Sequence, residues 1–302
     1  MKKTVLIVIG PTASGKTSCS IELAKRLNGE IVSADSMQIY KDMYIGTAAP
    51  TAEEKQGILH HLLGFVSPDE EYNVAKYQKD AFKVIDDILK RGKVPIVTGG
   101  TGLYINSLTY DLDFTQTKGN DDIRKQIGDE YDSDPVKIYN EILNNDPAAK
   151  DRIHINDKKR VVRRVEIIRS NGVGEYNFFK YNDRYDFKLI GLLKERTKLY
   201  NDINRRVDIM MDMGLEKEVK YVYDKYGKDI TAFLAIGYKE FLPYFEGSAP
   251  LEDVIYKIKQ NTRHYAKRQL TWFKRDNRIH WYNVDEFIDL DMFYNQIISN
   301  LK

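Results

Sequence analysis

The chain has 302 residues, of which 42% are hydrophobic and 30% charged, a balance typical of a soluble globular protein with one large or two smaller domains. Its 47 Lys and Arg residues nearly balance 45 Asp and Glu. The net charge of +2 excludes a strong overall attraction to nucleic acid, so only a local basic surface could provide one. Cys19 is the single cysteine, which excludes an internal disulfide, and we expect it to be a small buried residue.

The first predicted element is a strand over residues 4–9, where a continuous apolar run is typical of a strand buried on both faces of a sheet. Two lysines precede it, as in a signal peptide, but the run is too short for one and ends in Gly10-Pro11. No stretch of the sequence is apolar for long enough to span a bilayer. We therefore expect a cytoplasmic protein with no membrane partner.

Helices and strands then alternate along the first hundred residues. The hydrophobic pattern predicts helices over residues 18–27 and 73–91, and strands over residues 30–35 and 93–98. Such alternation is typical of a parallel α/β sheet, whose strands are connected by helices.

The pattern changes over residues 115–185, where strand-like runs disappear. Helices are predicted there over residues 121–130, 135–143 and 157–169. Strand character returns at residues 187–193, followed by helices at about 197–226 and 250–274, a strand at 278–282 and a terminal helix. We therefore expect one domain formed by residues 1–114 and 186–302, interrupted by a helical insertion domain of residues 115–185.

A glycine-rich loop after the first strand matches the pattern Gly-x-x-x-x-Gly-Lys-[Ser/Thr] in full. It consists of Gly10, Pro11, Thr12, Ala13, Ser14, Gly15, Lys16 and Thr17. Between a strand and a helix, such a loop directs amide N–H groups and the helix dipole at phosphate, while Lys16 adds a charge and Thr17 a hydroxyl for Mg²⁺. The alternative is a turn that binds no ligand. The pattern predicts an α/β fold: a P-loop NTPase-like parallel sheet core with a helical insertion domain.

Asp35 ends the second predicted strand, at the edge of a parallel sheet where ligands bind. It could hold Mg²⁺ through a water molecule, act as a general base, or only cap the following turn. Ser36, Met37, Gln38 and Tyr40 follow it. A glutamine can hydrogen-bond an adenine edge and a tyrosine can stack on a base, so this segment suits recognition of a heteroaromatic base.

Two further motifs are weaker. Gly99-Gly100-Thr101-Gly102 forms a second glycine-rich turn after a strand, and Thr101 could contact a phosphate or an acceptor, although a plain tight turn also fits. The pair His60-His61 could suggest zinc. Adjacent strand residues point to opposite faces and no cysteine or carboxylate cluster accompanies them, so we expect a buried or cleft-lining role instead.

Two local basic runs offset the neutral total, one over residues 158–169 and one over residues 257–278. In the first, Val161, Val165 and Ile168 form an apolar stripe that leaves most charges on other faces. In the second, Lys259, Arg263 and Lys267 are four residues apart and share a helix face, while Tyr265 and Trp272 line another. Basic helices with aromatic residues suit a nucleic-acid backbone, and a solvated helix face is the alternative.

Together these motifs resemble the tRNA dimethylallyltransferases, the bacterial tRNA isopentenyltransferases. The resemblance covers nearly the whole chain, in the family's order. It rests on residues 10–17, 33–40, 45–48, 60–62 and 99–104, on Asn156-Asp157 with Arg160, Arg163 and Glu166, on Arg206-Val207-Asp208 with Met211 and Gly214, and on residues 236–238 and 262–272. The chain departs from the family at Arg164, where Ala is usual, and at Lys158, where Pro is common.

The resemblance implies transfer of a dimethylallyl group from dimethylallyl diphosphate to the N6 amine of the adenosine 3′ to the anticodon, with release of pyrophosphate. Lys16, the loop amides and Mg²⁺ would stabilise the leaving pyrophosphate. Asp35 would be the general base for the amine. Thr101 would hold the diphosphate or the acceptor nucleotide, and Arg206 is a candidate for a further phosphate contact.

The implied partner is the tRNA anticodon stem-loop, whose target base must leave the loop stack to reach the cleft. We expect the insertion to clamp the stem-loop and the C-terminal basic helix to guide its backbone, in a protein that acts as a monomer. The residues expected to contact tRNA are Asp35, Ser36, Met37, Gln38, Thr101, Arg124, Lys159, Arg160, Val161, Val162, Arg163, Arg263, Lys267 and Arg268.

Two other functions fit parts of the sequence. An ATP-dependent small-molecule kinase could use the same phosphate loop, with Asp35 as base or metal ligand, and would need no RNA. A non-catalytic RNA-binding module would leave the combination of a complete phosphate loop with Asp35 unexplained.

Overall fold

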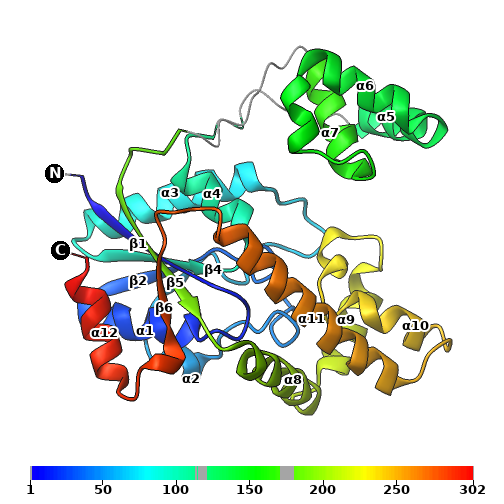
Figure 1. Ribbon diagram of the computed structural model, residues 1–302. Coiled ribbons are helices and arrows are strands. Elements are labelled where there is room, and N and C mark those ends of the chain that lie inside the picture. The colour runs from blue at the N-terminus through cyan, green and yellow to red at the C-terminus, as the bar shows by residue number, and fades with distance from the viewer. Residues whose placement is uncertain (1, 113, 115–120, 171–179, 302) are drawn as a thin grey trace. The chain divides into compact units, whose positions relative to one another are not determined.

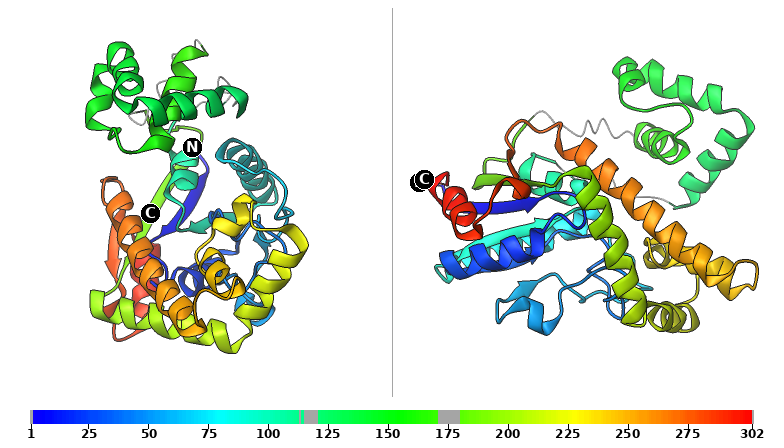
Figure 2. Two further views of the ribbon diagram at one scale, coloured as in Figure 1. Left: turned by 90° about the vertical axis from the view of Figure 1, so that its right-hand side faces the viewer. Right: turned by 60° about the horizontal axis from the view of Figure 1, so that its bottom comes forward.

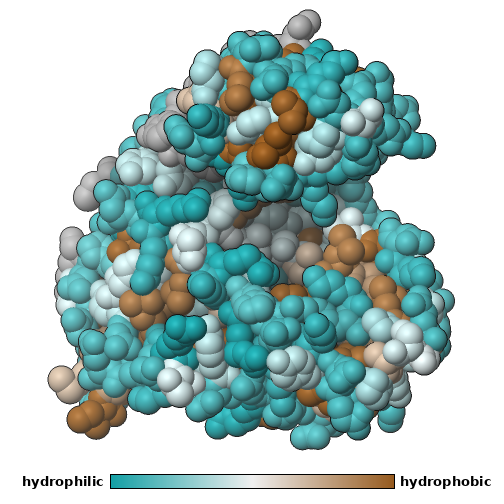
Figure 3. Space-filling model, turned by 45° about the vertical axis from the view of Figure 1, so that its right-hand side comes forward, coloured by the Kyte–Doolittle hydropathy of each residue, from teal (hydrophilic) through white to brown (hydrophobic). Residues whose placement is uncertain are grey.

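A computed structural model describes residues 2–112, 114, 121–170 and 180–301 of the chain (Figure 1). The chain divides into two compact units, one of Met1–Tyr110 with Tyr181–Lys302 and the other of Asp111–Lys180. Within the described ranges, no helix has both the length and the apolar character needed to cross a bilayer. On the face shown in Figure 3, hydrophilic residues predominate and apolar residues lie in separate patches.

The larger unit is built on a six-stranded parallel sheet with the strand order β3-β2-β4-β1-β5-β6. Its central strand β1 pairs with β4 and β5, so that Ile7 lies beside Val97 on one side and Leu189 on the other. Burial on both faces explains why this strand is a continuous apolar run. The predicted parallel α/β core is confirmed. The strands are β1 (Thr4–Ile9), β2 (Gly29–Ser33), β3 (His60–His61), β4 (Val94–Gly99), β5 (Asp186–Leu193) and β6 (His280–Asn283).

Helices cover both faces of this sheet (Figures 1 and 2). On one face, α1 (Lys16–Leu27) and α12 (Leu290–Ser299) pack against one set of strand side chains. On the other face, α3 (Val74–Lys90) and α4 (Gly102–Thr109) pack against the alternate set. The alternation of strand side chains therefore fills two separate apolar cores, one on each face.

A third apolar cluster involves helices that follow β5. They are α8 (Arg196–Asp212), α9 (Leu215–Tyr226), α10 (Leu242–Phe245) and α11 (Leu251–Phe273). With residues of the 37–45 segment they enclose Phe233, Tyr238 and Phe241. The sequence predicted one helix over about 197–226, but the structure divides it at Gly214, whose φ of 96° is left-handed and readily adopted by glycine. The short helix α2 (Ala52–Lys55) and four 3₁₀ segments (Pro147–Asp151, Thr231–Leu234, Lys239–Phe241 and Val284–Glu286) complete the described elements.

The smaller unit consists of α5 (Asp121–Ser133), α6 (Pro135–Asn145) and α7 (Lys158–Arg169) around its own apolar core. Val161 and Val165 of the predicted stripe are fully buried in this core. Arg164, where the chain departs from the family, donates from Nη2 to Asp146 Oδ2 at 2.8 Å. Arg152 also pairs with Asp146, so this departure adds a second arginine to one carboxylate.

The division between the units differs from the boundaries expected from the sequence, which lay at 114/115 and 185/186. Residues 115–120 and 171–179 lie outside the described part, and residues 181–185 belong with the larger unit. Tyr181 forms an antiparallel bridge with Tyr110, and the Arg278 guanidinium lies 3.9 Å from the centre of the Tyr181 ring and 4.5 Å from that of Tyr110. These contacts lie within the larger unit, at the points where the chain leaves it and returns to it.

His60 and His61 form the edge strand β3 of the sheet. Among the described residues no group of three His, Cys, Asp or Glu side chains could hold a metal ion. Instead His61 Nε2 lies 2.8 Å from Oε2 of the buried Glu30, which also pairs with Arg91 and Lys93. Cys19 is buried as expected, and burial raises the pKa of its thiol to about 12, so it has little nucleophilic character.

Candidate active site

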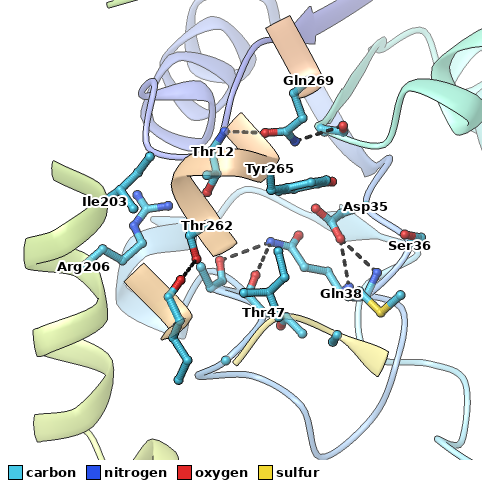
Figure 4. Close-up of a pocket in the computed structure, with 18 of the residues that line it drawn as sticks. Thr12, Asp35, Ser36, Gln38, Thr47, Ile203, Arg206, Thr262, Tyr265 and Gln269 are labelled. Carbon is cyan, nitrogen blue, oxygen red and sulfur yellow. Dashed lines mark hydrogen bonds between the residues drawn. The ribbon is translucent and has the colours of Figure 1, made fainter. Parts of the chain in front are cut away.

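The carboxyl ends of β1, β2 and β4 meet helices α8 and α11 around a cavity of about 340 Å³ in the larger unit. Figure 4 shows Asp35 and Ser36 on one side of it, Ile203 and Arg206 of α8 on the other, and Tyr265 of α11 between them. Parallel strands direct their following loops to the same edge, which explains why segments distant in sequence meet here.

The glycine-rich loop leaves the start of α1 open to an anion. Ala13 and Gly15 have φ angles of 64° and 90°, which turn the chain sharply before α1 begins at Lys16. No side chain of the described residues caps this helix start. Its first N–H groups and the positive end of its dipole can therefore receive a phosphate. A Cβ on Gly10 would lie 2.7 Å from Leu192 O, so the loop needs glycine at that position.

Lys16 lies in the cavity with its Nζ donating to Pro11 O at 2.7 Å. Burial, followed by the positive charge of Arg206, lowers its pKa to about 7, while the Asp35 carboxylate acts in the opposite direction. An anion in the loop would stabilise the ammonium form. Thr17, the predicted Mg²⁺ ligand, lines the same cavity.

Asp35 is held in one orientation by the backbone that follows it. Its Oδ1 accepts hydrogen bonds from Met37 N at 2.9 Å and Gln38 N at 3.4 Å. Burial raises the pKa of this carboxyl, and the two backbone hydrogen bonds and Lys16 partly oppose that rise. A fixed carboxylate with a raised pKa, facing a phosphate-binding loop, has the properties of a general base.

Thr101 joins the second glycine-rich turn to the Asp35 segment. Its Oγ1 accepts from Ser36 N at 3.0 Å and donates to Ser36 Oγ at 3.2 Å. A Cβ on Gly99 would lie 2.2 Å from Ala34 O, so glycine permits this close approach of the two strand ends. The structure thus brings Thr101 beside Ser36, at the border of the cavity.

The side chain of Gln38, for which the sequence suggested a contact with adenine, instead bonds to other residues of the protein. Its Nε2 donates to Thr47 O at 3.1 Å and Ala48 O at 3.2 Å, and its Oε1 accepts from Ser33 Oγ at 3.3 Å. In this structure the side-chain amide therefore holds the cavity wall formed by residues 46–48.

Glu218 of α9 supports the same wall and was not singled out from the sequence. Its carboxylate accepts from the backbone N atoms of Tyr44, Ile45 and Gly46 at 2.8–2.9 Å, and from Tyr238 OH at 2.5 Å. Such a set of donors fixes the 44–46 segment. No local pattern signals this role, because Glu218 and its partners are distant in sequence.

Arg206 lines this cavity and a second, adjoining one of about 530 Å³. Burial lowers the pKa of its guanidinium, whereas the nearby carboxylates of Glu54 and Asp202 favour its charge. Lys16 and Thr17 also line both cavities. The predicted phosphate contact of Arg206 is thus geometrically available, since it lies beside the loop.

Helix α11 contributes fewer free charges than its sequence suggests. Lys259 pairs with Asp208, and Arg263 Nη1 donates to Asn204 Oδ1 at 2.6 Å, so both contact α8. The Lys259, Arg263 and Lys267 series is therefore not a uniform solvated face. Lys267 is exposed, and Arg268 is exposed while also lining the cavity.

Tyr265 and Gln269 of the same helix also line the cavity. The sequence signal was present, because residues four apart share a helix face. The sequence identifies Gln269 only as a member of the 262–272 motif.

In the smaller unit, the predicted tRNA contacts fall into three groups. Lys159 and Arg160 of α7 are exposed. Arg124 and Arg163 both pair with the buried Glu166, which orients them side by side. Val161 is fully buried, so its side chain is unavailable to RNA, and Val162 is partly buried.

Comparison with known proteins identifies the family. A family model described as IPP transferase matches residues 38–276, and one described as isopentenyl transferase matches residues 3–64. Proteins named tRNA dimethylallyltransferase from Alkaliphilus oremlandii and Acetivibrio thermocellus are 47% and 48% identical to the chain, covering 100% and 99% of it and 98% and 96% of their own lengths. The chain belongs to the tRNA dimethylallyltransferase family.

Solved structures of the family agree with this assignment. The tRNA isopentenylpyrophosphate transferase of Bacillus halodurans is 40% identical, with a TM-score of 0.76 over 100% of this chain and 96% of that one. A eukaryotic dimethylallyltransferase described as acting on tRNA is 32% identical, with a TM-score of 0.80 over 93% of this chain and 74% of that one.

Proposed function

We propose that this chain transfers a dimethylallyl group from dimethylallyl diphosphate to the N6 amine of the adenosine 3′ to the anticodon of tRNA, releasing pyrophosphate. The observation that carries the proposal is the meeting of an open phosphate-binding helix start with Asp35 in one cavity. Membership of the tRNA dimethylallyltransferase family identifies the donor and acceptor classes that such a cavity serves.

In the proposed reaction, the C–O bond to the diphosphate breaks and a C–N bond to the adenine amine forms. The loop amides, Lys16 and Arg206 stabilise the negative charge that develops on the departing pyrophosphate. Asp35 accepts the proton that the amine loses as it becomes bonded to carbon. Thr101, which bonds to Ser36, helps to fix the acceptor side of the cavity next to that carboxylate.

A magnesium ion fits this site only together with the donor. The described residues contain no cluster of acidic ligands that could form a complete metal cage. Mg²⁺ commonly takes few protein ligands and completes its coordination with phosphate oxygens and water. Thr17 would hold the ion, with Asp35 contributing through water, and the bound ion would supply charge stabilisation to the leaving group.

For the RNA partner, we propose that the target base leaves the anticodon-loop stack and enters beside Asp35, Ser36, Met37, Gln38 and Thr101. The smaller unit would bind the stem-loop through Arg124, Lys159, Arg160, Val162 and Arg163. Helix α11 would bind it through Arg263, Lys267 and Arg268. We further propose that the protein acts as a monomer. Because the proposed substrate is tRNA, we propose a cytoplasmic location for this activity.

The deciding experiment combines the protein with Mg²⁺, labelled dimethylallyl diphosphate and unmodified tRNA whose anticodon is followed by adenosines. We expect label in the RNA and release of pyrophosphate. A matched tRNA with guanosine at the target position offers no N6 amine and should remain unlabelled. An unlabelled adenosine tRNA, together with ATP consumption on a small acceptor, would instead identify a kinase.

A further inference from the structure

Gln269 joins the two glycine-rich loops of the cavity through both ends of its side-chain amide. Its Oε1 accepts from Thr12 N at 2.8 Å, and its Nε2 donates to Gly100 O at 3.0 Å (Figure 4). The residue is 5% exposed. A buried amide with both hydrogen-bonding directions satisfied resists rotation, because turning it would leave donors and acceptors unpaired.

Neighbouring residues restrict the movement of the Gln269 side chain, which bridges the two loops. A Cβ on Gly100 would lie 2.0 Å from Gln269 Nε2, so the close approach depends on glycine there. Trp272, one turn further along α11, occupies the space where a Cβ on Gly102 would lie. Ala266 and Phe273 of the same helix are buried. On one side of Gln269, helix α11 is thus packed against the second turn, and on the other side Ala266 is in the same apolar cluster as Ala13 of the first loop.

Each end of the bridge belongs to a different half of the proposed reaction. Thr12 is in the loop that would hold the diphosphate donor. Gly100 precedes Thr101, whose hydroxyl contacts Ser36 next to the proposed base Asp35. Gln269 is therefore hydrogen-bonded to both the donor-side and the acceptor-side loop.

We propose that Gln269 is a positioning residue that couples donor binding to acceptor binding across the cavity. This inference rests on the proposed function, because it takes a diphosphate and an RNA as the two ligands. Coupling between two binding sites is reciprocal, so it is measurable from either side.

The test measures the affinity of Mg²⁺-pyrophosphate by calorimetry, with and without a saturating anticodon stem-loop RNA. In the unaltered protein we expect RNA to tighten pyrophosphate binding by about fivefold or more. Gln269→Met keeps the side-chain length but removes both hydrogen bonds, and should bring this ratio close to one while binding RNA alone normally. Gln260→Met, on the same helix but outside the cavity lining, is the matched control and should keep the full ratio.

Two further variants keep the inference testable if Gln269→Met fails to fold. Gln269→Glu retains an acceptor for Thr12 N but sets an oxygen against Gly100 O, and Gly100→Ala pushes the amide away from the opposite side. Both should lose the coupling. The inference is wrong if these folded variants keep the unaltered ratio, or if RNA does not change pyrophosphate affinity in the unaltered protein. Labelling of tRNA by that same protein would then show that the proposed function stands without the coupling.

Discussion

The cavity of the larger unit and the α7 surface of the smaller unit present polar groups in two different ways. In and beside the cavity, Asp35, Thr101 and Gln269 are each held by hydrogen bonds to backbone atoms. Those atoms belong to the residues just after it for Asp35, and to other loops for Thr101 and Gln269. On α7, Lys159 and Arg160 are exposed side chains. Fixed groups suit stabilisation of a transition state, whereas exposed cations suit salt-dependent attraction of phosphates. The difference predicts which changes alter the chemical step and which alter only RNA affinity.

The largest expected effect is at Asp35. Asp35→Asn keeps an acceptor for Met37 N but cannot take a proton from the amine, so single-turnover transfer at saturating substrates should fall by about 10²–10⁴-fold. RNA affinity, measured by filter binding, should change little. Asp212→Asn, at the exposed end of α8, is the control. Normal transfer by Asp35→Asn would remove this residue as the base.

The second largest effect on the transfer rate is expected at Lys16. Lys16→Met should slow transfer by about 10²–10³-fold, the typical loss of one preorganised electrostatic contact. Because the folded-state pKa is lowered to about 7, Lys16 is charged below that pH and loses its proton as pH rises through it.

Pyrophosphate affinity should therefore fall above pH 7 in the unaltered protein. Since pyrophosphate itself titrates, the measured quantity is the difference between the unaltered protein and Lys16→Met across pH 6–9. Parallel affinity profiles would contradict the assignment.

Substitutions on the α7 surface should lower RNA affinity and leave the chemical rate unchanged. Replacing Lys159 and Arg160 together by Ala should weaken tRNA binding by about tenfold and reduce its salt slope by about two, while transfer at saturating RNA stays unchanged. Lys137→Ala on α6, which is exposed, serves as the comparison. A loss of the chemical rate in the double variant would break the distinction between the two regions.

The smallest expected effect is at Arg164, whose charge faces Asp146 rather than open solvent. Arg164→Ala should lower the free energy of unfolding by about 1–2 kcal/mol, measured by urea denaturation, because it removes a hydrogen bond to a charged group. RNA affinity should remain within about twofold of the control Lys150→Ala, because the Arg164 guanidinium is engaged by Asp146. A large affinity loss would move Arg164 to the RNA-binding surface.

The sequence predicted local features well. The run at residues 4–9, the glycine-rich loop and the following helix are neighbours in sequence, so motif and periodicity were enough to define them. The apolar stripe containing Val161 and Val165 also predicted their burial, which the expected contact of Val161 with tRNA overlooked. Gly214 lies inside the predicted 197–226 helix and could have indicated a break, but the hydrophobic pattern of that region continues across it.

The supporting contacts of the site could not be predicted in the same way. Glu218 and Gln269 act through backbone atoms of residues far away in sequence, and backbone atoms have no sequence signature. Likewise, the sequence does not show which positive charges of α11 are paired, because their partners Asp208 and Asn204 lie on another helix, α8.

The junction of Tyr110, Tyr181 and Arg278 has a consequence for how such a chain can be rebuilt. Tyr110 and Tyr181 are bridge partners, so the two chain positions that flank the helical segment already lie next to each other in the larger unit. A short turn between them would replace residues 111–180 without shifting the register of any strand. We therefore expect that the helical segment can be removed or replaced, and that the shortened chain still folds and binds pyrophosphate.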